Sequence, residues 1–285
     1  METAVRSVTE YIDKCLSNPS LQKTDTRIFY RGVHRIFRES PHKPSIYYTD
    51  ERIKNEDRIF KEALSFLPEL LAWKTTVEKL IVMQHYRFPT RIMDISGNPL
   101  TALFFACFAD RSAESAGKDG MVYLYTVPDG KIKYCDSDAV SVIANLCKRP
   151  ADFSIRDICN LDRDEFNKEE PILYLIHEIC EEKPYFHPLV DKDDINSVVC
   201  LRPRMNNPRI IRQDGHFFLF GIDRDKTNPA KLKPEWIDQR RFLIPAEAKK
   251  KILRELEALN IHEAFVYPDF EHISSHVVGK YGGRA

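Results

Sequence analysis

Apolar side chains recur every three or four residues in several stretches of the chain, which is the spacing of one face of an α-helix. In the first stretch, Val5, Val8, Ile12 and Leu16 follow this spacing, and the pair Asn18-Pro19 should end an N-terminal helix within residues 1–20. The same pattern predicts further helices over Asp50–Leu71, from just after Trp73 to about His85, and over Asp138–Lys148, Glu170–Glu182, Pro245–Leu259 and Asp269–Tyr281.

Other stretches are short, rich in β-branched and aromatic residues and bounded by turn-forming residues, as β-strands are. They are Arg27–Tyr30, Thr90–Ser96, Gly120–Val127, Asn196–Pro203, His216–Asp223, Arg240–Ile244 and Ala264–Tyr267. Strands and helices are interspersed without strict alternation, which favours an α+β fold with a mixed β-sheet flanked by helices. We see no linker that divides the chain, so we expect a single domain over residues 1–285 with a helical insertion at residues 136–190.

The segment Leu100–Ala109 differs from the other helical segments because it is apolar on nearly every side. Asn98 is a good N-cap, and Pro99 suits the first helical position because its missing N–H would have no partner there anyway. A helix without a polar face belongs in a core. We therefore expect Pro99–Ala109 to be a buried helix.

The charges of the chain balance, since 43 Lys and Arg residues stand against 43 Asp and Glu residues. The net charge thus gives no attraction to nucleic acid or to an anionic membrane. The longest apolar stretch, Pro99–Ala109, is shorter than the roughly 20 residues that a membrane-spanning helix needs. The seven cysteines are scattered without a C-x-x-C pair, which argues against a metal site and favours reduced thiols in the cytoplasm. The P-loop, H-E-x-x-H and G-x-S-x-G signatures are absent.

Three polar clusters in apolar surroundings carry the candidate chemistry. The first is Phe29-Tyr30-Arg31-Gly32, where an expected strand runs into Arg-Gly. The guanidinium of Arg31 would stand at the edge of the sheet, where it can grip a phosphate or carboxylate with two parallel hydrogen bonds. Gly32 permits a close backbone approach. The alternative is a structural Arg31 that pairs with a nearby Asp.

The second cluster runs from a helix end through a Pro turn into a strand, with the sequence QHYRFPTRIMDIS. It concentrates polar or amphipathic groups at Gln84, His85, Tyr86, Thr90, Arg91 and Asp94. Burying so many hydrogen-bonding groups is unfavourable unless they satisfy one another or a ligand. The run therefore favours a site, although an Arg91–Asp94 ion pair could be purely structural.

The third cluster, Arg209–Phe217, contains a turn at Asp214-Gly215 that leads into an aromatic strand. Gln213 lies where its amide could face a pocket, whereas Asp214 and His216 are more simply structural. Because polar groups beside apolar runs need shared partners, we expect Arg31, Arg91, Asp94 and Gln213 to lie around one cleft.

These clusters, in this order, resemble the FRG-domain family. Its aromatic-Arg-Gly motif corresponds to residues 29–32. Its second motif corresponds to residues 84–106: it begins with Gln-His, continues through Pro-Thr-Arg and Asp, and ends in Asn-Pro and an apolar helix. A third motif, Arg-Ile-x-x-Gln-x-Gly-x-Phe, corresponds to residues 209–217. Pro245 and Tyr267-Pro268-Asp269 fit the family's tail, so the resemblance spans roughly residues 27–280. Arg87 and Ile95 depart from it, where the family often has Gly and Trp.

The resemblance implies bacterial or phage-borne domains whose layout is similar to that of ADP-ribosyltransferase-like domains. Such domains place an Arg or His on the first strand, a hydroxyl residue on a later strand and a carboxylate or amide on a third. Arg31, Thr90 or Ser96, and Gln213 occupy that order here. The substrate-binding set implied is Arg31, Gly32, Gln84, His85, Tyr86, Thr90, Arg91, Ser96 and Phe217.

On this resemblance the first hypothesis is an NAD-dependent ADP-ribosyltransferase or NAD glycohydrolase, a toxin or anti-phage defence effector with a macromolecular ADP-ribose acceptor. Arg31, helped by Arg91, would hold the pyrophosphate, and Tyr86 or Phe217 would stack on the nicotinamide. Gln213 stands where such transferases usually carry Glu, so Asp94 could supply the negative charge instead. The alternative is a non-catalytic module that binds a nucleotide or another phosphorylated ligand.

Overall fold

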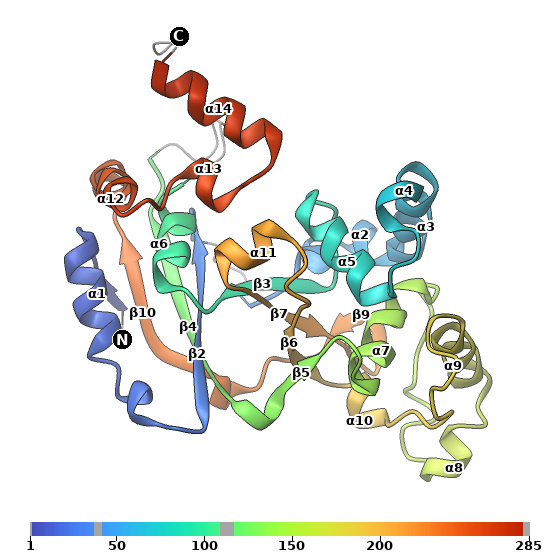
Figure 1. The fold of residues 1–285 in the computed structure, drawn as a ribbon. Coiled ribbons are helices and arrows are strands. Elements are labelled where there is room, and N and C mark those ends of the chain that lie inside the picture. Colours follow the sequence, from blue (N-terminus) through green and yellow to red (C-terminus); the bar gives the residue numbers. More distant parts are fainter. Residues whose placement is uncertain (1, 37–41, 109–116, 282–285) are drawn as a thin grey trace.

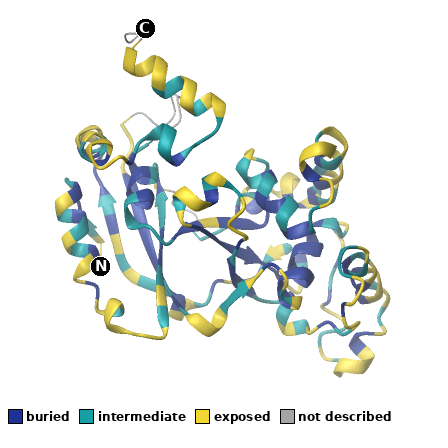
Figure 2. Cartoon of the chain, viewed as in Figure 1, coloured by how far each residue is buried: buried dark blue, intermediate teal, exposed yellow. Residues whose placement is uncertain are grey.

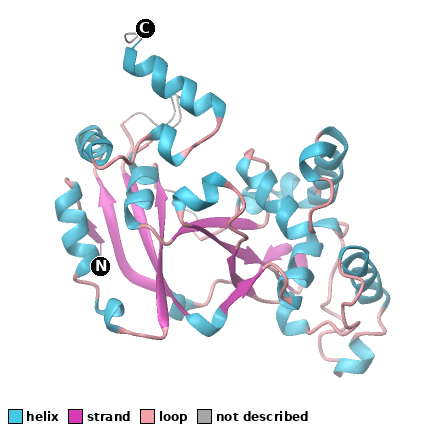
Figure 3. Cartoon of the chain, in the orientation of Figure 1, coloured by secondary structure: helices cyan, strands magenta, loops and turns pink. Residues whose placement is uncertain are grey.

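The computed structural model describes residues 2–36, 42–108 and 117–281, and its centre is an eight-stranded sheet (Figures 1 and 3). Most neighbouring strands are antiparallel, but both edge pairs are parallel. The expected α+β fold, a mixed sheet flanked by helices, is therefore confirmed. The strand order is β1 (Glu2–Ala4), β10 (Ile237–Ile244), β4 (Gly120–Pro128), β2 (Thr26–Val33), β3 (Ile92–Ser96), β7 (Gly215–Phe220), β6 (Val198–Arg202) and β5 (Ile132–Tyr134).

The sheet is divided between β2 and β3. Strand β2 pairs along its whole length with β4, and β3 pairs along its whole length with β7. In contrast, β2 and β3 meet at a single residue pair, Tyr30 opposite Ser96. In Figure 1, β2, β4 and β10 stand upright on the page, with β4 antiparallel to the other two, while β3 and β7 cross it. Beyond Tyr30 and Ser96 the two strands separate, which leaves an opening in the middle of the sheet.

Helices cover one face of each half of the sheet. One apolar cluster joins α1 (Val8–Leu16), α6 (Pro99–Cys107) and α12 (Ala246–Ala258) to β2, β4 and β10. A second cluster joins α3 (Glu56–Phe66), α5 (Thr76–His85), α7 (Asp138–Asn145) and α9 (Glu170–Glu182) to β3, β6 and β7. The opposite face of both halves shares a third cluster, which includes Phe29, Met93 and Phe218. The strands at the centre of the sheet are mostly buried (Figure 2). The opening between β2 and β3 therefore lies between the two groups of helices.

Several segments differ from the sequence-based expectation. The segment Asp50–Leu71 is broken into α2 (Asp50–Lys54), α3 and α4 (Pro68–Leu71). The second break follows from Pro68, which has no N–H to continue the helix. Residues 264–267, expected as a strand, instead lie mainly in the single helical turn of α13 (Glu263–Val266). Val266 is fully buried in the cluster that contains α6 and α12.

The segment His216–Asp223, expected as one strand, is divided into β7 and β8 (Ile222–Asp223), which pairs with β9 (Asp225–Pro229). Gly221 stands between the two strands, where a side chain would meet the carbonyl oxygen of Ile195 at 2.0 Å. The pattern also missed β1, β5 and the short helices α8 (Arg163–Phe166), α10 (Lys192–Ile195) and α11 (Pro208–Gln213), whereas the closing helix α14 (Phe270–Tyr281) was expected.

Helix α6 has the N-cap that the sequence predicts, since Asn98 Oδ1 accepts hydrogen bonds from the N–H groups of Leu100 and Thr101. Leu103 is fully buried, but Phe105 is half-buried and faces the opening in the sheet. The expectation of burial on every side is thus wrong for Phe105. The expected last residue, Ala109, lies outside the described residues.

Leu103→Ala is expected to lower the free energy of unfolding by about 2–5 kcal/mol, because it leaves a cavity in the α6–α12 cluster. Phe105→Ala is the matched control on the same helix, and we expect a smaller loss because its ring is already partly exposed. Urea denaturation followed by circular dichroism measures both. Equal losses would show that the two side chains are equally buried in solution.

Candidate functional site

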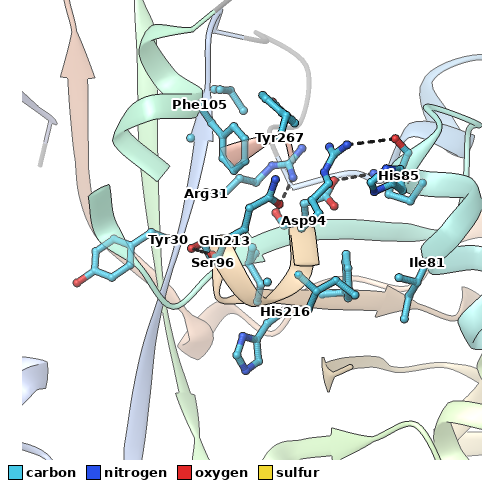
Figure 4. A pocket seen from close by; sticks show the side chains of 18 of the residues that line it. Tyr30, Arg31, Ile81, His85, Asp94, Ser96, Phe105, Gln213, His216 and Tyr267 are labelled. Carbon is cyan, nitrogen blue, oxygen red and sulfur yellow. Dashed lines mark hydrogen bonds between the residues drawn. The ribbon is translucent and has the colours of Figure 1, made fainter. Parts of the chain in front are cut away.

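A pocket of about 420 Å³ opens where β2 and β3 separate (Figure 4). Its volume falls within the range of roughly 300–1,000 Å³ that is usual for small-molecule sites. Strands β2, β3 and β7 form its floor, and α5, α6, α11 and the segment around Tyr267 form its walls. The chemically important lining residues are Arg31, Gln84, His85, Asp94, Ser96, Phe105, Arg209, Gln213, Phe217, Tyr267 and His272.

Asp94 is the exposed residue in the middle of an otherwise buried strand. Its neighbours Met93 and Ile95 are 1% and 3% exposed and pack on the opposite face of the sheet. The alternation of β3 turns Asp94 the other way, into the pocket. One carboxylate oxygen, Oδ2, accepts a hydrogen bond of 2.6 Å from Gln84 Nε2. An acid at this position would be unfavourable in a core, so the pocket explains why it is tolerated.

Arg31 reaches the same pocket from β2. The strand continues through Arg31 to Val33, so Arg31 stands inside the sheet, at the separation of β2 from β3, and not at the strand end that the sequence suggested. Its Nη1 donates to the backbone oxygen of Asp94 at 2.8 Å, and its Nε is buried without a hydrogen-bond partner. Within the described ranges, no carboxylate lies at ion-pair distance from this guanidinium. Arg31 and Asp94 therefore face one pocket without neutralising each other.

Thr90 supports Gln84 from behind the pocket. It is buried, and its Oγ1 donates to Gln84 Oε1 at 2.7 Å. Thr90 does not line the pocket, so the predicted contact between Thr90 and a ligand is absent. Thr90 instead contacts Gln84, which does line the pocket.

Arg91 lies outside the pocket, and the expectation that it shares the cleft with Arg31 is wrong. It is fully buried and forms a two-pronged ion pair with Glu56 of α3, with Nε 2.9 Å from Oε1. Lys226 Nζ lies 3.4 Å from the same carboxylate, at Oε2. The separation of three residues along an extended segment directs Arg91 and Asp94 to opposite sides. Their proposed ion pair is therefore replaced by the Glu56 cluster, which we define as Glu56, Arg91 and Lys226.

Gly32 lies where it was expected, whereas Tyr86 does not. Gly32 borders the pocket, but a side chain on it would meet the carbonyl oxygen of Ala102 at 1.8 Å. Its lack of a side chain thus allows α6 to pack closely on β2. Tyr86 is 51% exposed and lines a separate apolar groove over α3 and α4. Phe217, the other candidate for ring stacking, does line the pocket.

Gln213 and Ser96 line the pocket and at the same time fasten its walls. Gln213 Nε2 donates to the backbone oxygen of Val266 at 2.9 Å, which ties α11 to α13. Ser96 Oγ donates to the backbone oxygen of Gln213 at 2.5 Å and accepts the N–H of Asn98. The structure brings Arg31, Asp94 and Gln213 together around one pocket, as expected.

Residues 26–115 match the family model described as FRG domain. The chain contains an FRG domain. The matched region holds Arg31, Gln84 and Asp94, which all line the pocket. No curated protein and no solved structure matches the chain.

We call the pocket between β2 and β3 the FRG pocket. Its remaining wall, formed by Arg209, Tyr267 and His272, was not predicted from the sequence. The guanidinium of Arg209 lies 4.6 Å from the ring centre of Tyr267, and its Nη1 donates to the backbone oxygen of His85 at 3.3 Å. His272 stacks on Tyr267 with ring centres 4.4 Å apart, and its Nδ1 lies 2.8 Å from Glu263 Oε1. Both Arg209 and Tyr267 lie in segments that resemble the family's motifs, and this could have indicated them as site residues. The sequence did not predict α11 and α13, the helices that bring them together.

His85 adds a neutral group to the FRG pocket. Burial, with a smaller contribution from the positive charge of Arg209, lowers the pKa of His85 to about 4. Its imidazole is therefore uncharged at neutral pH, and the charges that face a ligand belong mainly to the arginines and Asp94.

The described residues contain no group of three or more His, Cys, Asp or Glu side chains arranged to hold a metal ion. All seven cysteines are free, and five of them are buried. In the same described ranges, the helices are all too short or too polar to cross a membrane.

Proposed function

We propose that the FRG pocket binds NAD and breaks the bond between its nicotinamide and ribose, as an NAD glycohydrolase or ADP-ribosyltransferase does. The observation that carries the proposal is the arrangement of Arg31 and Asp94. They present opposite charges to one pocket without pairing with each other. Such a pair suits a ligand that carries a phosphate near a group on which positive charge develops.

Arg31 is suited to the pyrophosphate. Its Nε is unpartnered and buried, and a phosphate oxygen would supply the missing acceptor. A guanidinium can bind phosphate through two parallel hydrogen bonds. Arg209 adds positive charge to the same pocket. Arg91, the helper suggested by the sequence, is committed to Glu56 and takes no part.

Asp94 is suited to the reacting ribose. When the bond from the anomeric carbon to nicotinamide breaks, both bonding electrons leave with the ring, and positive charge develops on the ribose. A nearby carboxylate stabilises this charge better than a neutral amide. Water, or a side chain of an acceptor, then bonds to the anomeric carbon and releases a proton. We favour Asp94 over Gln213 for this role, because the amide of Gln213 is already hydrogen-bonded to the backbone of Val266.

The apolar walls suit the leaving ring. Phe105 and Phe217 border the pocket on α6 and β7, and both offer aromatic surface. The volume of about 420 Å³ is at the lower end of the usual range, so we expect the pocket to enclose the reacting part of NAD and leave the other nucleotide outside.

The second candidate function is nucleotide binding without cleavage. One observation favours it: among the described residues that line the pocket, Asp94 is the only carboxylate, and Gln84 already holds one of its oxygens. The same Arg31 would then anchor a phosphate, and no bond would break.

Arg31→Ala is expected to weaken NAD binding about 10- to 150-fold, the equivalent of one charged hydrogen bond, while Arg31→Lys restores part of it. Isothermal titration calorimetry measures both. Arg27→Ala is the matched control, because Arg27 lies on the same strand but pairs with Asp129 outside the pocket. A folded Arg31→Ala protein with unchanged affinity would remove the assigned anchor.

Asp94→Asn separates the two candidate functions. If Asp94 stabilises the reacting ribose, this change should lower the rate of nicotinamide release about 100-fold or more while NAD still binds. If the FRG domain only binds, purified protein releases no nicotinamide and Asp94→Asn changes nothing in that assay. Transfer of labelled ADP-ribose to protein, measured in parallel, distinguishes a transferase from a glycohydrolase.

A further inference from the structure

We infer that the apolar face of α14 is an interface through which two copies of this chain pair, with their α14 helices antiparallel. This interface is independent of the proposed function, because the side chains that form it lie outside the lining of the FRG pocket.

Helix α14 turns its polar side toward the rest of the domain. His272 stacks on Tyr267 and His276 stacks on His262, in each case with ring centres 4.4 Å apart. The helix projects from the domain (Figure 1), and most of its length is exposed (Figure 2). Its exposed apolar side chains, which are 40–89% accessible, are Phe270, Ile273, Val277, Val278 and Tyr281.

This arrangement is the reverse of an ordinary surface helix, which buries its apolar stripe and turns its polar side to water. The structure describes all twelve residues of α14, and none of them is buried. With 3.6 residues per turn, Phe270, Val277 and Tyr281 form the middle of one stripe, and the docked residue His272 lies on the opposite side. A stripe of this kind marks a surface that a second molecule covers.

The order of the residues in α14 identifies that molecule as a second copy, because the types of residue are nearly the same in both directions. Aromatic rings stand at both ends, Phe270 and Tyr281, and β-branched residues lie at matching distances inside them, Ile273 and Val278. A twofold pair requires a surface that is complementary to itself. In an antiparallel pair, Phe270 of one copy faces Tyr281 of the other at both ends, and the two Val277 side chains meet near the axis.

The charges on α14 favour the antiparallel direction. Glu271 flanks the stripe at the first turn and Lys280 flanks it at the last. An antiparallel pair places Glu271 of one copy level with Lys280 of the other at both ends, whereas a parallel pair places like charges level with each other. Opposite charges across an interface favour a pairing and like charges oppose it. Lys280 Nζ also lies 5.5 Å from the ring centre of Tyr281, so its charge stays at the edge of the stripe.

The size of the interface sets its strength. Twelve residues make a helix about 18 Å long. One pair of helices of this length buries less than the roughly 1,200–2,000 Å² of a stable interface. We therefore expect a transient dimer, with monomers at low micromolar concentration and dimers toward the millimolar range.

Sedimentation equilibrium of the 285-residue chain over this concentration range tests the pairing. Val277→Asp would bring two carboxylates together near the axis, so we expect it to weaken dimerisation about 100-fold or more. Leu173→Asp is the matched control, because Leu173 is a 51% exposed apolar residue on α9, and this variant should dimerise like the wild type. A wild-type chain that stays monomeric at every concentration would overturn the inference, and so would a Val277→Asp chain that still dimerises.

Exchange of the two charges tests the direction of the helices. Glu271→Lys and Lys280→Glu should each weaken the dimer about threefold to tenfold at low salt, and the double variant should regain most of the loss. The double variant has the least favourable charges for the dipole of α14 itself, so recovery cannot come from a more stable helix. Single variants without effect, or a double variant without recovery, would rule out the antiparallel pair.

The apolar groove over α3 and α4 is the competing place for α14 of another copy. Such a head-to-tail contact would build assemblies larger than a dimer. Phe66→Asp tests this arrangement, because Phe66 lines the groove and is 79% exposed. We expect Phe66→Asp to dimerise like the wild type, and loss of association in this variant would replace the antiparallel pair with the groove.

Discussion

Glu56→Gln is expected to lower the free energy of unfolding by about 3–5 kcal/mol, the usual effect of breaking a buried ion pair from one side. The Glu56 cluster places two cations, Arg91 and Lys226, both 0% exposed, against one carboxylate that is 3% exposed. Without that carboxylate, both cations would remain buried, and among the described residues neither has another ion-pair partner. Burial already lowers the pKa of Lys226 in the wild-type protein, and Glu56 is the main influence that opposes this.

Lys226→Met is the matched control. It leaves Arg91 and Glu56 as a neutral pair, so we expect a change near zero or a small gain in stability. The pH dependence gives a further check. Because the folded pKa of Lys226 lies below its ordinary value of 10.5, the unfolded chain binds more protons at alkaline pH, and stability rises with pH in that window. The loss caused by Glu56→Gln should therefore shrink as the pH approaches 10.5, and a loss that is independent of pH would contradict this account.

Gly32→Ala is expected to destabilise the protein by more than the roughly 1–3 kcal/mol that is usual for overpacking. The new methyl group would lie 1.8 Å from the carbonyl oxygen of Ala102 in α6, and a backbone atom cannot move aside as the end of a side chain can. Helix α6 would have to move away from β2, and Phe105 would move with it. We therefore expect a lower unfolding midpoint in urea and weaker ligand binding in the same variant.

Gly130→Ala is the control for Gly32→Ala. A side chain at Gly130 would have no neighbour within 4 Å among the described residues, so its effect should stay within about 0.5 kcal/mol. Gly120→Ala should resemble Gly32→Ala, because it would approach the carbonyl oxygen of Ala106 at 2.1 Å. If Gly32→Ala and Gly130→Ala proved equally stable, the close packing of α6 on the sheet would be wrong.

Part of the site could be predicted from sequence because it depends on local rules. The N-cap at Asn98 and the extended segment that carries Asp94 both follow from neighbouring residues. The alternation of side chains along that segment also indicates that Arg91 does not face the pocket with Asp94. Residues 91 and 94 differ by an odd number, so a strand cannot present both to one pocket.

The rest of the site depends on contacts between distant segments. The opening that receives Arg31 exists because β2 and β3 share a single pair of residues, and no local pattern indicates where two strands separate. The role of Gln213 depends on Val266, more than fifty residues later, in a helical turn that the sequence presented as a strand. Buried partners can also be distant in sequence, since Glu56 and Arg91 are 35 residues apart.

The strand order also limits how the FRG region can be exchanged between proteins. Residues 26–115 carry β2 and β3, but the partner along β2 is β4 and the partner along β3 is β7, both of which come later in the chain. A fragment that ends at residue 115 would keep Arg31, Gln84 and Asp94 yet leave two strand edges open to pairing with other molecules. A transplant of this region should therefore fold only when residues 120–128 and 215–220 move with it.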